Sequence, residues 1–385
     1  MILQNVRRFR PIEAELLREQ VEKCADEREG RADLVLLLRL GADINELVEV
    51  ADRFLPGHKI YRETALHLAA SIGSVDTVLT LLEYGAAVER RDSAGWSALI
   101  RASWKGRTPV VKVLLEAKAA IDVVTEDKHW TALMQASHKG HLDVVRVLTE
   151  AGADPNKSAR DGEYTALLLA SMAGHSKVVE ILISAGANME ACDGHYGSTP
   201  LIWASDIGNV EVVRILIEGK ADPNAQCGIG QTALIKASEN GHTEVVRAIL
   251  TASEDVDVDA CDPDGTRALM LAAGIGYTDI VKLLVEAKAN LHAVDAYRKT
   301  ALARACDRGH DAVAEILRGA AASAAASSVL PAPPEDLNLV TNTRRWRDRS
   351  TDPGREGIYR YSTAGRVSSG DAPESFGDLD PSFGV

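Results

Sequence analysis

Histidine and cysteine are the side chains that most often ligate metals or act as nucleophiles, and the chain has ten and five of them. The five cysteines are odd in number, widely spaced and without a Cys-x-x-Cys pair, which argues against a disulfide framework. They are Cys24, Cys192, Cys227, Cys261 and Cys306. His138 and His141 have the spacing of two ligands on a helix, but Gly140 between them ends that helix. We therefore predict no metal site.

Catalytic motifs are also missing from the sequence, which has no G-x-S-x-G, no P-loop and no H-E-x-x-H. Asp255, Asp257 and Asp259 alternate as calcium ligands do, but the glutamate that completes an EF-hand loop is absent. A calcium site at these residues stays an alternative. We predict that the protein is not an enzyme and uses no cofactor and no small-molecule substrate.

The charge of the chain excludes further classes of partner. Its 385 residues include 43 basic and 56 acidic side chains, which give a formal net charge of -13. A surface of this sign repels the phosphates of nucleic acids and of anionic lipids. No apolar stretch reaches the length of about 18 residues that a membrane-spanning helix needs, and residues 1–12 lack the apolar segment expected of a secretory signal. We expect a cytosolic or nuclear protein that binds neither nucleic acid nor membrane.

The elements that must position any site come from an internal repeat. A Thr-Ala-Leu triplet or a close variant recurs eight times, and its leucines lie 33 to 35 residues apart. These leucines are Leu66, Leu99, Leu133, Leu167, Leu201, Leu234, Leu269 and Leu302. Each is followed by an alanine, a glycine and then an apolar run at helical spacing. Every unit therefore predicts a helix, a turn, a second helix and an extended loop.

At these residues the sequence resembles the ankyrin repeat family. Residues 64–70 are close to the T-P-L-H-x-A pattern of the family, and residues 140–145 with 152–156 match the second half of its repeat. The resemblance covers about residues 11–319. It implies an all-α solenoid of about nine repeats, each a helix-turn-helix followed by a hairpin loop. It also implies a structural role, hydrogen bonding to backbone and threonine groups, for His67, His141, His175, His242 and His310.

Four segments are expected along the chain. Residues 1–45 would form a degenerate N-terminal capping repeat, and residues 46–63 a long inserted loop. Residues 64–319 would hold eight repeats that end in a C-terminal cap. Residues 320–385, rich in Ala, Ser, Pro and Gly, would be a disordered tail that nevertheless contains Trp346 and two Ser-Phe-Gly sequences.

Helix ends can be predicted from single residues. Thr or Ser precedes the first helix of almost every unit as an N-cap, but Arg267 stands in this place in one of them. The second helix ends at a glycine in several units, where a left-handed conformation is favoured. Lys118, Lys220 and Lys288 occupy the same place in three others, at an expected cost of about 1 kcal/mol each.

Aromatic residues concentrate in neighbouring repeats at the positions that vary between units. The candidate protein-binding residues are Trp96, Trp104, Trp130, Tyr164, Met172, Tyr196 and Trp203. We expect them on the exposed concave face, because exposed Trp and Tyr dominate protein-binding sites. On this hypothesis, alanine at both Trp96 and Trp130 abolishes binding and leaves the melting temperature almost unchanged. The alternative is that they pack between repeats as ordinary filler.

Asn45, Asn156 and Asn224 form a second candidate group. Each follows an aspartate by two residues and a leucine by eight, which resembles the pattern read by the asparaginyl hydroxylase of ankyrin repeats. A tight turn favours asparagine for purely structural reasons, and this alternative is preferred.

Two functions follow from the resemblance. The first is a scaffold or adaptor that binds partner proteins on the concave face of the solenoid. The alternative is a targeting or inhibitory subunit, which presents a client to a kinase, phosphatase or ubiquitin ligase recruited through the C-terminal tail.

Overall fold

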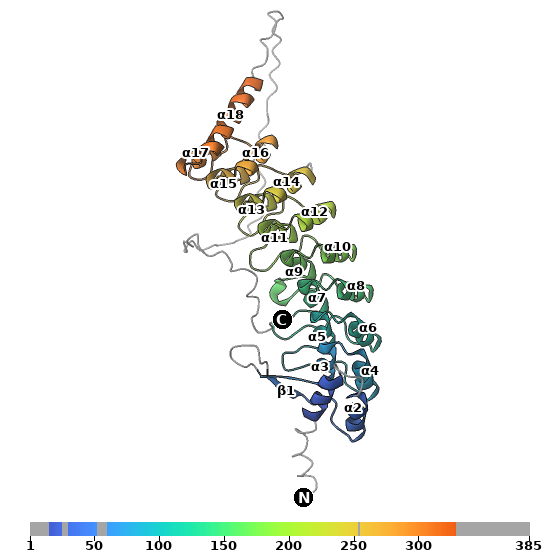
Figure 1. The fold of residues 1–385 in the computed structure, drawn as a ribbon. Helices are drawn as coiled ribbons and strands as arrows, with labels where there is room; N and C mark the ends of the chain where they lie inside the picture. The colour runs from blue at the N-terminus through green and yellow to red at the C-terminus, as the bar shows by residue number, and fades with distance from the viewer. Residues whose placement is uncertain (1–14, 25–29, 52–59, 253–254, 329–385) are drawn as a thin grey trace, which may run out of the picture.

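The computed structural model describes residues 15–24, 30–51, 60–252 and 255–328, and it is a stack of helix pairs (Figure 1). The first helices of the pairs are α3 (Ala65–Ile72), α5 (Ala98–Trp104), α7 (Ala132–Lys139), α9 (Ala166–Ala173), α11 (Pro200–Ile207), α13 (Ala233–Glu239), α15 (Ala268–Ile275) and α17 (Ala301–Asp307). The second helices are α4 (Val75–Glu83), α6 (Thr108–Glu116), α8 (Leu142–Glu150), α10 (Ser176–Ser184), α12 (Val210–Glu218), α14 (Thr243–Ala252), α16 (Thr278–Glu286) and α18 (Asp311–Ser328). The expected helix-turn-helix repeat is confirmed.

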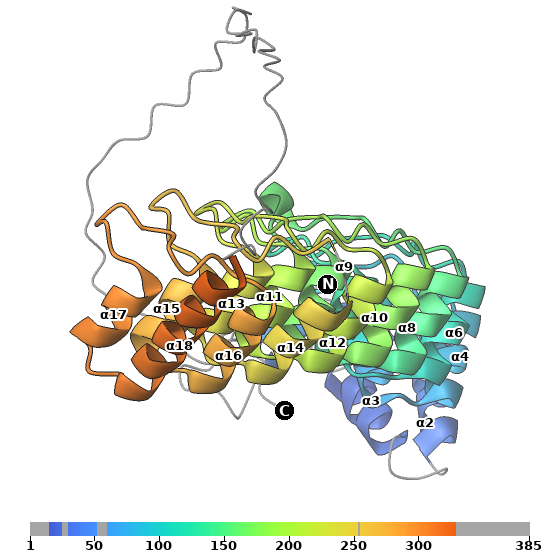
Figure 2. The same cartoon turned by 90° about the horizontal axis from the view of Figure 1, so that it is seen from above.

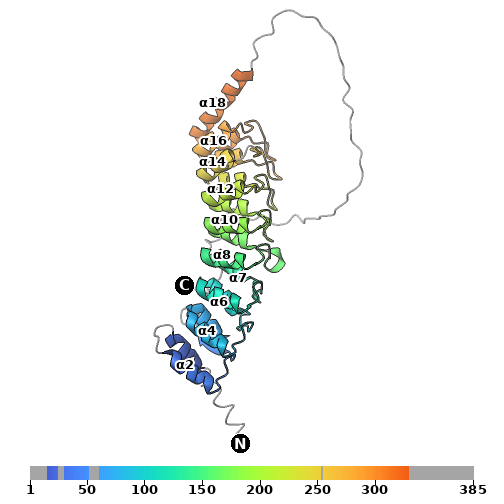
Figure 3. The same ribbon diagram turned by 90° about the vertical axis from the view of Figure 1, so that its right-hand side faces the viewer.

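The stack has two layers of helices. Each first helix packs on the first helix of the next repeat, and the second helices pack on one another in the same way. The loops between repeats extend from one side of the stack (Figure 2). Seen along the layers, the stack bends gently toward its N-terminal end (Figure 3). This is the all-α solenoid that the repeat predicts.

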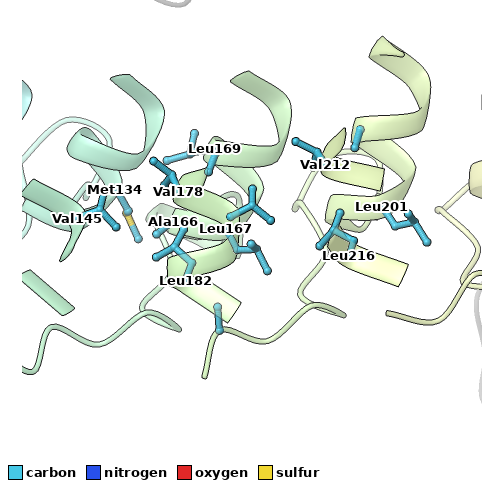
Figure 4. Packing of buried hydrophobic residues seen from close by; sticks show 14 of the residues in the cluster. Met134, Val145, Ala166, Leu167, Leu169, Val178, Leu182, Leu201, Val212 and Leu216 are labelled. Atoms are coloured by element: carbon cyan, nitrogen blue, oxygen red, sulfur yellow. The ribbon is translucent and has the colours of Figure 1, made fainter. Parts of the chain in front are cut away.

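One hydrophobic core runs through the repeats from Leu17 to Leu317. Leu99 and Leu133, from neighbouring units, are both 1% exposed and belong to this same cluster. Figure 4 shows how Leu167 and Leu201 continue the core from one pair to the next. Because each pair buries its apolar face only against its neighbours, the stability of a repeat depends on the repeats beside it.

The caps lie where the sequence predicts them. The hydroxyl of Thr131 accepts a hydrogen bond from the Met134 amide at 3.2 Å, and other repeats use the same N-cap bond. Arg267 makes no such bond. Its guanidinium instead donates to the carbonyl oxygens of Asp259 and Gly265, at 3.1 and 3.0 Å. This helix therefore begins without the N-cap of its neighbours.

The glycine after the first helix is required by both its backbone and its neighbour. Gly140 has a φ of 73°, and a Cβ at this position would lie 2.6 Å from the ring of His175 in the next repeat. Glycine thus allows the helix to end in the left-handed conformation and lets the following histidine approach.

The expected strain at the end of the second helix is present. Lys118, Lys220 and Lys288 have φ values of 65°, 76° and 64°, where a Cβ is unfavourable. All three side chains are exposed, so glycine would remove the strain without removing buried contacts. We expect each Lys→Gly change to raise the free energy of unfolding by about 1 kcal/mol, measured by urea denaturation.

Lys112 provides the matched control for this prediction. It is an exposed lysine within helix α6, and glycine there should instead destabilise by about 1 kcal/mol. If neither Lys118→Gly nor Lys220→Gly raised the free energy of unfolding, the left-handed backbone at these residues would carry no energetic cost.

Two expectations about the segments are wrong, one for the structure of residues 46–63 and one for the boundary at residue 319. Within residues 46–63, the chain forms the strands β1 (Val48–Ala51) and β2 (Ile60–Glu63), paired antiparallel with Val48 opposite Glu63, rather than a loop. Val48, Val50, Ile60 and Tyr61 are β-branched or aromatic residues, which favour strands. Helix α18 continues to Ser328, past the expected boundary at residue 319, because alanine has the highest helix propensity.

The capping repeat and the tail are described in part. Residues 15–24 and helix α2 (Gly30–Arg39) contribute Leu17, Val21 and Leu34 to the core, as a capping repeat should. The tail after residue 328, with Trp346 and the Ser-Phe-Gly sequences, lies outside the described residues.

Candidate protein-binding site

The repeat histidines join neighbouring repeats. The Nε2 atoms of His141, His175, His242 and His310 lie 2.8, 3.1, 2.9 and 3.1 Å from carbonyl oxygens of the preceding repeat, those of Trp104, His138, Asp206 and Gly274. His67 lies 2.8 Å from the Thr64 hydroxyl through Nδ1 and 2.9 Å from the Trp96 carbonyl through Nε2. Burial lowers the pKa of His67 to about 4, which keeps its ring neutral. The structural role implied for these histidines is confirmed.

Metal-binding clusters do not occur in the described part of the chain, where no three His, Cys, Asp or Glu side chains converge. Two of the three carboxylates of the alternative calcium loop, those of Asp257 and Asp259, accept backbone hydrogen bonds. Oδ1 of Asp257 accepts from the Asp259 amide at 3.0 Å, and Oδ1 of Asp259 accepts from the Asn290 amide at 2.9 Å. These bonds give the alternating aspartates a structural role.

The candidate asparagines also bridge adjacent repeats. The Asn156 amide group donates to the Gly186 carbonyl at 3.0 Å and accepts from the Asn188 amide at 2.7 Å. Asn224 makes the same two bonds, with Asp255 and Asp257, and Oδ1 of Asn45 accepts from the Ala87 amide. Hydroxylation of Asn45, Asn156 and Asn224 stays a prediction, while these bonds supply the structural role that turns favour.

The tryptophans before the N-caps are buried, so the expectation that they are exposed is wrong. Trp96 and Trp130 are 3% and 5% exposed. The Trp96 ring lies edge-on to Trp104 with centroids 5.7 Å apart, and the Arg101 guanidinium stacks 5.2 Å from its centroid. Trp130 packs on His138 in a similar way, with centroids 5.4 Å apart. Each tryptophan fills the space between its hairpin arm and the following helix.

Met172 and Trp203 are also buried, at 6% and 8% exposed, so their expected exposure is wrong as well. With Leu168 they form a small cluster separate from the main core, against which the partly buried Tyr164 packs. Trp104 is partly buried under the Lys105 ammonium, whose Nζ lies 4.1 Å from the indole centroid. A small cluster outside the main core is a local patch on the face formed by the first helices and the loops.

Tyr196 is the candidate residue that is exposed as expected, at 58%. Its ring meets Trp203 edge-on, with centroids 6.0 Å apart. A solvent-facing aromatic ring therefore continues the small buried cluster outward.

Asp193 positions these rings and was not recognised in the sequence. One of its carboxylate oxygens accepts from the amides of His195 and Tyr196, at 2.9 and 2.6 Å. The other accepts from the Ser198 amide and the Trp203 indole, both at 2.9 Å. The signal was available, because Asp92, Asp262 and Asp295 hold their own loops from equivalent places just before the cap.

A pocket of about 180 Å³ opens beside Tyr196, between helices α11 and α13. It is lined by Tyr196, Ser198, Ile202, Trp203, Asp206, Cys227, Ile229 and Lys236. We call it the aromatic pocket. Ile229, at the tip of the next loop, is 58% exposed. The pocket is smaller than the 300–1,000 Å³ typical of small-molecule sites, and its walls are mostly apolar, so it suits one large side chain of a partner.

The surroundings of the aromatic pocket are acidic. On the helices, the Lys236 ammonium lies 3.6 Å from carboxylate oxygens of both Asp206 and Glu239. On the loops, Gly230 packs against Asp262 and Pro263, which places a further acidic loop at the rim. The acidic side chains are Asp206, Glu239 and Asp262, and Lys236 is the one lysine that lines the described pocket. The charged side chains around the aromatic pocket are therefore mostly acidic.

Comparison with known families agrees with this geometry. A family model described as ankyrin repeats (3 copies) matches residues 24–127, 117–193, 167–260 and 249–326. The chain belongs to the ankyrin repeat family. Among curated proteins, it is similar to protein phosphatase 1 regulatory subunit 27 of Mus musculus.

That similarity is limited in extent. The two sequences are 30% identical over 87 residues, which cover 21% of this chain and 56% of the mouse protein. No described helix combines the length and the hydropathy of a membrane span.

Proposed function

We propose that the chain is a non-catalytic adaptor of the cytosol or nucleus, which binds a partner protein by taking one of its large side chains into the aromatic pocket. Ankyrin repeats mediate interactions between proteins. The observation that carries the finer proposal is a solvent-open apolar pocket with the exposed Tyr196 and Ile229 at its rim. Anchors that enter such pockets supply most of the affinity in protein interfaces.

The rigid wall of the pocket supports the same proposal. Trp203 is held by its indole bond to Asp193 and by the ring of Tyr196. Binding therefore does not have to order this wall, and ordering costs are a large part of the free energy lost in association. Partly buried Tyr164, with Met172, supports Trp203 from the preceding repeat.

The experiment compares two double variants of the full chain. The pocket variant carries Tyr196→Ala and Ile229→Ser. We expect it to weaken capture of the partner about thirtyfold, as for the loss of about 2 kcal/mol at a hot spot. Its melting temperature should hardly change, because both side chains are more than half exposed. Affinity capture followed by titration calorimetry with the isolated partner measures the effect.

The control variant carries Tyr297→Ala and Val294→Ser in the last loop. These side chains are 74% and 51% exposed but do not line the aromatic pocket. Capture should be unchanged. Equal binding by the pocket variant and the control variant would contradict the proposed site.

The similarity to a phosphatase regulatory subunit favours a second candidate function. In this proposal the repeats hold a client, while a segment of the tail after residue 328 recruits a phosphatase. Deleting residues 329–385 should then remove phosphatase activity from the captured complex and leave the client bound. Retained phosphatase activity after the deletion would exclude recruitment through the tail.

A further inference from the structure

We propose that the tail of the chain itself occupies the aromatic pocket, through Trp346 and its flanking arginines. The inference rests on the proposed function in using the same pocket, but its test needs no partner protein. The tail would then compete with a partner for this site.

Charge is the first argument. Asp206 lines the pocket, Glu239 lies beside it through Lys236, and Asp262 lies beside Gly230 of the neighbouring loop, whereas Lys236 is the one lysine in the pocket lining. In the sequence, Trp346 stands between two arginines on each side, interrupted by a single aspartate. They are Arg344, Arg345, Arg347 and Arg349, with Asp348. A basic segment around a large aromatic ring is thus complementary to an acidic rim around an aromatic pocket.

Chemistry within the pocket also fits an indole. Tyr196 and Trp203 present rings that meet edge-on, which leaves aromatic surface for a third ring. Asp206, which lines the pocket and is partly exposed, can accept a hydrogen bond from an indole N–H or a guanidinium. Ile229 would cover the opposite side of the ring.

The tether is long enough to reach. Helices α13 and α17 are two repeats apart, about 20 Å at the usual helix spacing. Helix α18, with 18 residues, extends about 27 Å. The segment from residue 329 to Trp346 spans up to about 60 Å when extended. A tether of this length gives an effective concentration on the order of millimolar, so a weak contact suffices for occupancy.

Photo-crosslinking within the full chain tests the proposal. Trp346→p-benzoylphenylalanine places a photoreactive aromatic group in the tail, and trypsin then releases residues 178–214, with Tyr196 and Trp203, and residues 221–236, with Ile229. We expect crosslinks within single chains to concentrate on these two peptides. The yield of these crosslinks should fall roughly tenfold in the pocket variant and stay unchanged in the control variant.

A second set of variants tests the charge and the position. Arg345→Glu with Arg347→Glu should lower the same crosslinks, because the acidic rim would repel the altered segment. Tyr359→p-benzoylphenylalanine, in the same tail, should not favour the two pocket peptides. Crosslinked dimers whose yield rises with protein concentration would mean that a second copy is bound instead. Crosslinks scattered over the repeats, or equal in the pocket and control variants, would also overturn the proposal.

The test separates this inference from the proposed function. If the crosslinks fail but the pocket variant still loses its partner, then only occupancy by the tail is wrong. If the crosslinks succeed but the pocket variant retains its partner, then the pocket holds the tail and the partner binds elsewhere.

Discussion

Alanine at both Trp96 and Trp130 is expected to unfold the repeats that contain helices α5 to α8. Both side chains are almost fully buried, and removing a buried Trp side chain typically costs about 3–5 kcal/mol. Since the two residues lie in neighbouring repeats, their combined cost approaches the total stability of about 5–15 kcal/mol usual for a domain. Circular dichroism and urea denaturation should show lost helix and a lower unfolding midpoint.

If the two rings were exposed, the double alanine variant would instead lose its partner and keep its melting temperature almost unchanged. The control is Tyr196→Ala with Tyr297→Ala, which truncates two exposed aromatic side chains and should leave the free energy of unfolding within about 0.5 kcal/mol of wild type. If the Trp96→Ala, Trp130→Ala protein kept its helix and midpoint but lost its partner, the two rings would be part of the binding site after all.

Arg101→Met is expected to cost about 3–5 kcal/mol, because it leaves buried carboxylates without their cation. The Arg101 guanidinium lies 2.6 Å from Asp92 and 3.9 Å from Glu63, and the three side chains are at most 5% exposed. Burial raises the pKa of Glu63 to about 7, although the charge of Arg101 lowers it in part. Denaturation at several pH values should show a cost that grows as the pH rises.

The sign of this pH dependence follows from Glu63. Its pKa is raised in the folded chain, so its contribution to stability is present below about pH 4.5 and is lost as the pH rises through about 7. Without Arg101 the pKa of Glu63 rises further, because the positive charge that partly lowers it is gone. The loss of folding stability at high pH then becomes larger. Adding Glu63→Gln to Arg101→Met should therefore reduce the pH dependence. A cost that is independent of pH would contradict the placement of Glu63 beside Arg101.

The repeat architecture could be predicted because its signals are local. N-cap threonines, glycines and helical spacing each fix a short segment of backbone, and eight repetitions of the same pattern reinforce one another. The strain at Lys118 and the missing cap at Arg267 could be predicted for the same reason. The strand pair at residues 48–63 was missed because two four-residue segments carry a weak signal.

The binding site could be predicted only in part, because it depends on packing between repeats. A side chain at a position that varies between repeats can face either solvent or the neighbouring repeat. The repeat period of the sequence does not distinguish these two orientations. Trp96 turned inward against Trp104 and Arg101, whereas Tyr196 at the tip of a loop stayed exposed. The pocket itself joins Tyr196 to Ile229 of the next repeat, a pairing that neither unit shows alone.

Hydrogen exchange of the full chain, alone and with its captured partner, tests the central claim most directly. If a partner side chain enters the aromatic pocket, protection should increase in the loops and first helices around it, at residues 193–207 and 226–236. Unchanged exchange there, with protection confined to the second helices α10, α12 and α14, would contradict the account.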